Sequence, residues 1–166
     1  MKGRGMALRK GFVAMTLAAG AALCGCGHDR PSAGLGSAYG LYYNDQGSAA
    51  SLAYGLANSD DVALMLQCDK GKGRVEVSDI VRTRPAPRLV LTSAGRSTAV
   101  AVKVGQGESD GPRVLTGQTP LDAPALAAFR STGRIEVLNG DVRYRLKASD
   151  AERTAVEQFF TACGRA

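Results

Sequence analysis

The sequence has no tryptophan, and its single histidine is His28. Aromatic residues make up 5% of the 166 residues. One histidine argues against a Ser-His-Asp triad and against a histidine-based metal site, because both need an imidazole beside further groups. The small aromatic share argues against a surface on which sugars or bases stack.

Motifs of several enzyme classes are also missing. There is no G-x-x-x-x-G-K-[ST] phosphate loop, and the one match to G-x-S-x-G, GESDG at 107–111, precedes a predicted strand rather than the helix that a nucleophile turn requires. Residues 69–79 and 105–111 place acids near glycines, but their spacing is not that of an EF-hand loop, and we interpret them as solvated turns. We therefore expect no enzyme, cofactor or metal, while the fifteen acids leave a pair of catalytic carboxylates open.

The N-terminus lacks acids. Residues 1–10 carry four cations and residues 11–25 carry no charge. A basic head followed by a short apolar segment is typical of an export signal. As a helix, the apolar segment would span about 22 Å, short of the ~30 Å hydrocarbon layer. A permanent membrane span is therefore not expected.

The apolar segment ends in Leu23-Cys24-Gly25-Cys26. This tetrapeptide resembles the lipobox of bacterial lipoproteins, with Leu23 at the first position, Gly25 at the small position and Cys26 as acceptor. Cys24 departs from the pattern, because a small aliphatic or hydroxyl residue is more usual there. The resemblance implies cleavage before Cys26 and lipid attachment to it, usually including palmitate. Two acyl chains anchor a protein stably.

Two other interpretations of this segment remain. An ordinary cleaved signal would give a soluble periplasmic or secreted protein. A C-x-C metal pair would need more ligands than His28 supplies. Under the lipoprotein resemblance, Gly27 stands where aspartate often signals inner-membrane retention, so the outer membrane is favoured over the inner.

Removal of the signal peptide, residues 1–25, leaves 141 residues, enough for one domain. The net charge falls from +6 to +2, because four cations leave. The remaining cations and acids are interleaved, without the basic stripe of a nucleic-acid-binding protein. We expect an acylated Cys26 with a flexible tether over 26–39, and a single globular domain over 40–166.

Cys68 and Cys163 remain as a pair, and an oxidising compartment favours a structural disulfide. Cys68 lies on the apolar face of the alternating segment 62–68. Cys163 lies on the apolar face of a helix expected to begin at Ser149. A bridge would then pin this helix to the sheet. The alternative is a free catalytic thiol, for which His28 is the only possible imidazole base.

Alternation with a period of two dominates from residue 41 onward and predicts strands. The predicted strands cover 50–56, 62–68, 75–78, 88–93, 97–104 and 113–116, with a hairpin at 134–147. A helix is expected at 122–132 with Asp122 as N-cap, and a C-terminal helix starts at a Ser149–Glu152 capping box. The fold class is α+β and mostly β: one antiparallel sandwich or strongly curved sheet of seven to nine strands, with a disulfide-pinned C-terminal helix.

The hairpin prediction is the most detailed. Asn139-Gly140 is the preferred dipeptide of a type I′ turn. With these two residues as the loop, Glu136 lies opposite Arg143, an ion pair on the outer face.

Two groups of side chains are candidate binding surfaces. Tyr42 and Tyr43 lie where the tether meets the domain, and they equally fit an N-terminal strand that covers the core edge. The hairpin carries Arg134, Arg143, Arg145 and Lys147. These cations suit an acidic partner or anionic lipid headgroups, and they equally fit a solvated strand face.

Five segments resemble those of small exported proteins, often lipoproteins, of proteobacteria. They are LAYG (52–55), DVALMLQC (61–68), LVLTSAG (89–95), AFRSTGRIEV (128–137) and FFTACG (159–164). This resemblance implies location and fold, since it carries no catalytic motif.

We therefore expect a periplasm-facing membrane lipoprotein that acts as a non-catalytic binding or envelope-structural module. Its partner would be a periplasmic protein or another envelope component, and not a nucleic acid. The alternative is an inhibitor of an envelope-directed enzyme such as a lysozyme. Residues 91–99 (LTSAGRSTA) match the signature loop of such inhibitors only loosely.

Overall fold

The structure is a computed structural model, and it describes residues 38–81, 88–105 and 112–164. Within these residues the chain forms nine strands and two helices. The strands are β1 (Tyr39–Gln46), β2 (Ala49–Leu56), β3 (Val62–Asp69), β4 (Arg74–Val81), β5 (Arg88–Ser93), β6 (Arg96–Val104), β7 (Arg113–Pro120), β8 (Arg134–Asn139) and β9 (Val142–Lys147). The helices are α1 (Pro124–Thr132) and α2 (Asp150–Cys163).

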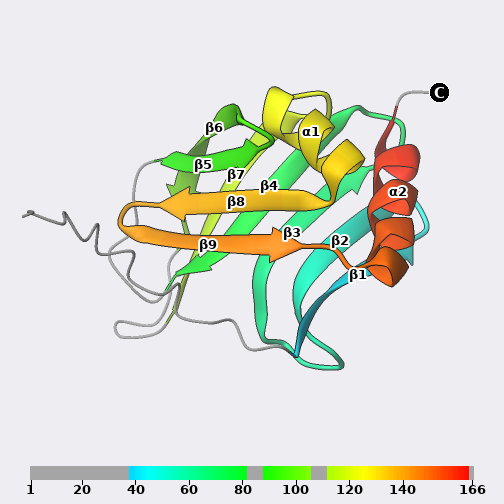
Figure 1. The fold of residues 1–166 in the computed structure, drawn as a ribbon, viewed down its shortest axis with the longest axis horizontal. Coiled ribbons are helices and arrows are strands. Elements are labelled where there is room, and N and C mark those ends of the chain that lie inside the picture. Colours follow the sequence, from blue (N-terminus) through cyan, green and yellow to red (C-terminus); the bar gives the residue numbers. More distant parts are fainter. Residues whose placement is uncertain (1–37, 82–87, 106–111, 165–166) are drawn as a thin grey trace, which may run out of the picture.

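All neighbouring strands are antiparallel, and they form one sheet in the order β1-β2-β3-β4-β7-β6-β5-β8-β9. The sheet curls into a half-barrel, so that β8 and β9 cross in front of β3 and β4 (Figure 1). The bend lies at β6, where residues 96–101 pair with β5 and residues 102–104 pair with β7. Of the two expected architectures, the strongly curved sheet is the one that forms.

A close approach of backbones at the bend depends on Gly117 in β7. This residue lies opposite Val77 of β4 on one side and Val102 of β6 on the other. A Cβ at Gly117 would come within 2.4 Å of the Ala101 carbonyl oxygen and 2.7 Å of Val100 Cγ1. Glycine inside a strand often marks such an approach. Its missing side chain lets β6 cross β7 closely enough for the sheet to curl.

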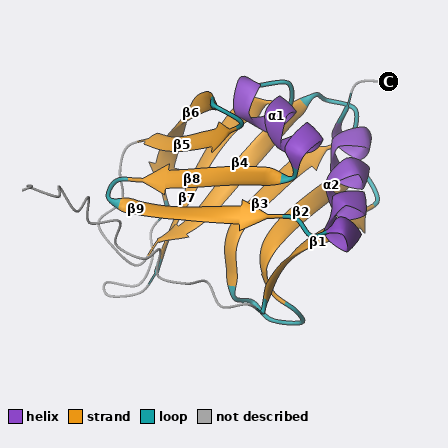
Figure 2. Cartoon of the chain, viewed as in Figure 1, coloured by secondary structure: helices purple, strands orange, loops and turns teal. Residues whose placement is uncertain are grey.

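The inward side chains of the sheet form the core together with both helices. Helix α2 packs on β1 and β2, and α1 packs on β5 and β6 (Figure 2). The helices contribute three fully buried aromatic side chains, Phe129, Phe159 and Phe160. The ring centroid of Phe160 lies 6.2 Å from that of Phe129 and 5.6 Å from that of Phe159, both in edge-on contact. The apolar face expected for the C-terminal helix is confirmed.

The expected N-cap of α1 is wrong. Ala123, rather than Asp122, occupies the N-cap position, and no side chain of this residue caps the helix. Pro124 sits in the first turn, where its missing N–H leaves one donor fewer to satisfy. The N–H of Ala125 donates to Thr98 Oγ1 at 3.0 Å. The Thr98 hydroxyl of β6 therefore accepts a hydrogen bond from the first turn of α1, which is the role expected of Asp122.

Helix α2 begins with the expected capping box. The Ser149 hydroxyl accepts a hydrogen bond from the Glu152 N–H, and Glu152 Oε2 accepts one from the Ser149 N–H at 2.7 Å. The other carboxylate oxygen, Oε1, accepts from the N–H of Leu41 in β1, also at 2.7 Å. Partial burial raises the pKa of Glu152, but the hydrogen bonds from Ser149 and Leu41 outweigh it and hold this pKa below its usual value. One carboxylate thus caps the helix and ties it to the sheet.

The expected disulfide is confirmed. Cys68 on β3 and Cys163 at the end of α2 are both buried, and their Cα atoms lie 5.8 Å apart across the bridge. Beside it, the N–H of Gly71 donates to the Ala162 carbonyl, and the N–H of Gly73 donates to the Cys163 carbonyl. The disulfide and these two bonds fix the C-terminus of α2 against the turn between β3 and β4.

The β8–β9 hairpin forms, but the expected register is wrong by two residues. Glu136 lies opposite Arg145 rather than Arg143, and the two-residue loop is Gly140-Asp141. Because the displacement is even, every side chain keeps its expected face.

The shift in register has its cause in Asn139. Its side chain is 1% exposed and donates a hydrogen bond to Asp79 Oδ2 at 2.9 Å across the interior. Asn139 therefore stays in the strand, and Gly140 becomes the first loop residue with a φ of 57°. Glycine at that position is typical of a type II′ turn rather than the expected type I′.

Candidate functional site

Five cations lie on the outer surface of the three neighbouring strands β5, β8 and β9. Inward residues of these strands pack in the core, so their alternating neighbours point outward. Cross-strand pairing places Arg134 opposite Lys147, and Leu138 opposite Arg143. We call the following exposed residues the cationic face: Arg88, Arg134, Arg143, Arg145 and Lys147.

One acid, Glu136, lies among these cations. Its Oε2 is 2.6 Å from Arg145 Nε, and its Oε1 is 3.5 Å from Arg143 Nε. A single carboxylate is thus shared by two guanidinium groups. No ion pair among the described residues involves the side chains of the other three cations, Arg88, Arg134 and Lys147. The face keeps a clear excess of positive charge.

Charge is distributed unevenly over the molecule. The cationic face and Glu136 together hold five cations and one acid. The rest of the described chain holds eight cations and eleven acids. The described chain therefore has a small net charge, but one side of it is positive and the rest is negative.

The cationic face is hollowed at one end. A shallow groove of about 450 Å³ is lined by Thr92, Arg134, Glu136, Arg145 and Lys147, with nearby backbone. Guanidinium groups donate paired hydrogen bonds to carboxylates and phosphates, and lysine adds a point charge. This arrangement suits an anionic group.

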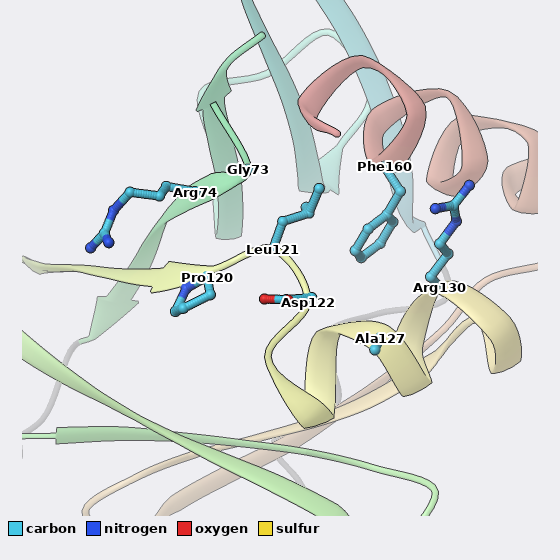
Figure 3. A pocket seen from close by; sticks show the side chains of 8 residues that line it. All are labelled: Gly73, Arg74, Pro120, Leu121, Asp122, Ala127, Arg130 and Phe160. Atoms are coloured by element: carbon cyan, nitrogen blue, oxygen red, sulfur yellow. The ribbon is translucent and has the colours of Figure 1, made fainter. Parts of the chain in front are cut away.

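A second groove, of about 470 Å³, lies where α1 and α2 meet the ends of β4 and β7. In Figure 3 the Phe160 ring lies between Leu121 and Arg130, whereas the side chain of Arg74 points away from them. The other cation that lines this groove, Arg130, forms an ion pair with Glu157.

Arg130 is paired with Glu157 of α2. Its Nε lies 3.0 Å from Glu157 Oε2, and its Nη2 also contacts Oε1. The pair raises the pKa of Arg130 and lowers the pKa of Glu157. The guanidinium also lies 5.9 Å from the Phe160 ring centroid. We therefore interpret the second groove as a packing seam between the helices and the sheet.

Sequence reasoning missed a buried polar cluster inside the half-barrel. Asp79 of β4 accepts hydrogen bonds from Tyr144 Oη at 2.5 Å and from Asn139 Nδ2 at 2.9 Å. Burial raises the pKa of Asp79, although both hydrogen bonds oppose that shift. Burial and the nearby Asp79 carboxyl raise the pKa of Tyr144 well above its ordinary value, so its hydroxyl remains a donor.

A signal for this cluster was present in the sequence. Asp79 follows Val75 and Val77 at a spacing of two, which places its carboxyl on the inward face of β4. A buried acid needs hydrogen-bond partners. The partners lie about sixty residues away, so the local pattern could not name them.

The predicted site residues are distributed as follows. Arg134, Arg143 and Arg145 come together on the cationic face. Tyr42 is 42% exposed on the outer side of β1, whereas Tyr43 packs against the core, so the two do not form one surface. The lipid-attachment residue predicted in the sequence, Cys26, lies outside the described residues.

No group of His, Cys, Asp or Glu side chains in the described part of the chain could hold a metal ion. No helix among the described residues has the length and apolar character needed to cross a membrane. No protein-family model matches the sequence, no curated protein matches it, and no solved structure matches the fold.

Proposed function

We propose that this chain is a lipid-anchored, non-catalytic binding module of the cell envelope, with the cationic face as its binding surface. The proposed anchor is Cys26, which a tether joins to the β-domain. The observation that supports the binding role is the segregation of charge onto one side of three adjacent strands.

Rigidity supports this assignment. The ladders β5–β8 and β8–β9 hold the cations at fixed spacings, and the inward side chains of these strands are buried in the core. A surface that is ordered before binding loses less conformational entropy when a ligand arrives. The shared Glu136 further restrains Arg143 and Arg145. The strands that carry the face therefore need no rearrangement to meet an anionic ligand.

The proposal assigns no reaction to the molecule. Among the described acids, Asp79 has its pKa raised by burial, as a general acid requires, yet it is 1% exposed. Its two carboxylate oxygens are bonded to Tyr144 and Asn139. We interpret this cluster as a structural tie between β4 and the β8–β9 hairpin.

The anchor is tested by metabolic labelling with palmitate in bacterial cells that produce the full chain. Cys26→Ser should abolish incorporation, whereas Cys24→Ser, the matched control, should retain it. The reverse pattern would move the acceptor to Cys24, and no label in either variant would contradict lipidation.

The binding surface is tested by crosslinking in intact cells. We compare the variant Arg88→Gln/Arg134→Gln/Lys147→Gln with a control, Lys72→Gln/Arg74→Gln/Arg113→Gln, that removes the same charge from exposed residues elsewhere. A crosslinked protein or phospholipid that disappears in the first variant and persists in the control supports the proposal. Equal patterns in both would contradict it. A captured envelope enzyme that the wild-type chain inhibits would favour the inhibitor alternative.

A further inference from the structure

We propose that the ligand of the cationic face is the anionic phospholipid surface of the membrane that holds the anchor. This inference rests on the proposed function and names the partner at the same site. The domain would lie with the outer side of β5, β8 and β9 against the headgroups.

The dimensions of the face suit an extended surface. Three strands spaced about 4.8 Å apart make it roughly 10 Å wide, and six residues of strand make it about 20 Å long. Its cations occur on all three strands, at Arg88 of β5, at Arg134 of β8, and at Arg143, Arg145 and Lys147 of β9. Several headgroups can therefore be contacted at once.

The uneven charge distribution would set the orientation. An anionic surface attracts the five cations of the face and repels the remainder of the described chain, where eleven acids outnumber eight cations. Attraction on one side and repulsion on the other select one orientation more strongly than a uniformly basic protein could.

The tether keeps the face near the proposed surface. Twelve residues, 27–38, separate Cys26 from the start of β1. A fully extended chain of that length spans at most about 40 Å. The anchored domain thus meets the membrane at a high effective concentration, so weak contacts at the face are sufficient.

The side chains on the face favour lipid over an acidic protein. The uncharged outward side chains between its cations include Val90, Thr92 and Leu138, and none of the outward residues of β5, β8 or β9 is aromatic. Hot spots of protein interfaces are enriched in tryptophan and tyrosine as well as arginine. Attraction to headgroups needs only positive charge close to the surface.

The test measures co-sedimentation of the full chain with vesicles, in a Cys26→Ser background that removes acylation. One set of vesicles is phosphatidylcholine, and the other contains phosphatidylglycerol as well. We expect the apolar segment 11–25 to bind both compositions and the four cations of residues 1–10 to favour phosphatidylglycerol in every variant, so the face is reported by the difference between variants. We expect tighter binding to phosphatidylglycerol vesicles, weakening as salt is added.

The two charge variants localise the effect. Each cation near an anionic surface contributes about fivefold in affinity. Arg88→Gln/Arg134→Gln/Lys147→Gln should therefore lose at least about tenfold and up to on the order of a hundredfold. The control Lys72→Gln/Arg74→Gln/Arg113→Gln should lose much less. Circular dichroism confirms that both variants are folded.

Two results would overturn the proposal. Equal losses in the two variants would mean that overall charge, rather than the face, drives binding. Absence of any preference for phosphatidylglycerol would exclude lipid as the ligand, and a face-dependent protein crosslink in cells would then identify an acidic protein in its place. In that case the proposed function stands, because it fails only through the palmitate and crosslinking experiments.

Discussion

The carboxyl of Asp79 contributes a pH dependence to the stability of the fold. Its pKa in the folded chain is raised by burial above its ordinary value. The folded state therefore holds the proton more tightly than the unfolded chain does. The contribution of Asp79 to stability is fully present below its unfolded pKa, near 3.9. It is lost as the pH rises through the higher folded value.

Asp79→Asn should remove this dependence. We expect the free energy of unfolding of the variant to improve relative to wild type as the pH rises from about 4 to about 8. Urea unfolding across this range measures the difference. Tyr144→Phe should instead become less stable relative to wild type as the pH rises over this range, because it deletes the hydrogen bond that favours the charged carboxylate of Asp79. Parallel stability curves for the three proteins would contradict a titration of Asp79.

Gly117 is the residue on which the bend of the sheet depends most directly. Gly117→Ala should cost about 1–3 kcal/mol, because the new methyl group would collide with the Ala101 carbonyl oxygen. Adding Val100→Ala should not rescue the variant, since the closer of the two contacts is with backbone. Urea unfolding provides the measurement. An unchanged midpoint would show that β6 can move away at little cost.

At the scale of elements, α2 is joined to β1 through Glu152. Ser149→Ala removes one half of the capping box and should cost about 1 kcal/mol. Glu152→Ala also leaves the Leu41 N–H without its partner, so we expect about 2 kcal/mol. Hydrogen exchange at the Leu41 amide separates the two effects. It should accelerate in the Glu152 variant and stay slow in the Ser149 variant; equal rates would rule out the link to β1.

Element positions could be predicted from the sequence because alternation and capping are local. The inward placement of Cys68 and the Ser149–Glu152 cap followed from spacings of two and three residues. The hairpin register could not be predicted, because Asn139 is held in its strand by Asp79, sixty residues away. The start of α1 was missed because Thr98 of β6 satisfies its backbone.

The candidate site shows the same division between local and distant information. Arg134, Arg143 and Arg145 lie on one hairpin, so their common face was predicted from alternation. Arg88 joins them only because β5 pairs with β8, across more than forty residues of chain. The order of strands is set by packing of the whole core, so no short segment of the sequence predicts it.

At the scale of the whole molecule, the disulfide joins two cysteines that are 95 positions apart in the chain. Chain-entropy arguments predict that its loss lowers the free energy of unfolding by about 4–5 kcal/mol. Urea unfolding of Cys68→Ala/Cys163→Ala, with and without reductant, provides the measurement. Reductant should bring wild type to the stability of the variant and leave the variant unchanged. Equal stability of oxidised wild type and variant would show that the bridge contributes nothing.

Strand β1 ends one side of the sheet, and an uncovered edge strand can pair with a strand from another copy of the chain. In the folded protein α2 lies against β1, and Glu152 accepts a hydrogen bond from the outward N–H of Leu41. Helix α2 follows all nine described strands in the chain, so a molecule whose sheet has formed first still presents this edge. The bond between Cys68 and Cys163 holds the covering helix in place. Its loss removes one of the attachments of this helix, so we expect reduction to favour pairing of β1 with another copy of the chain.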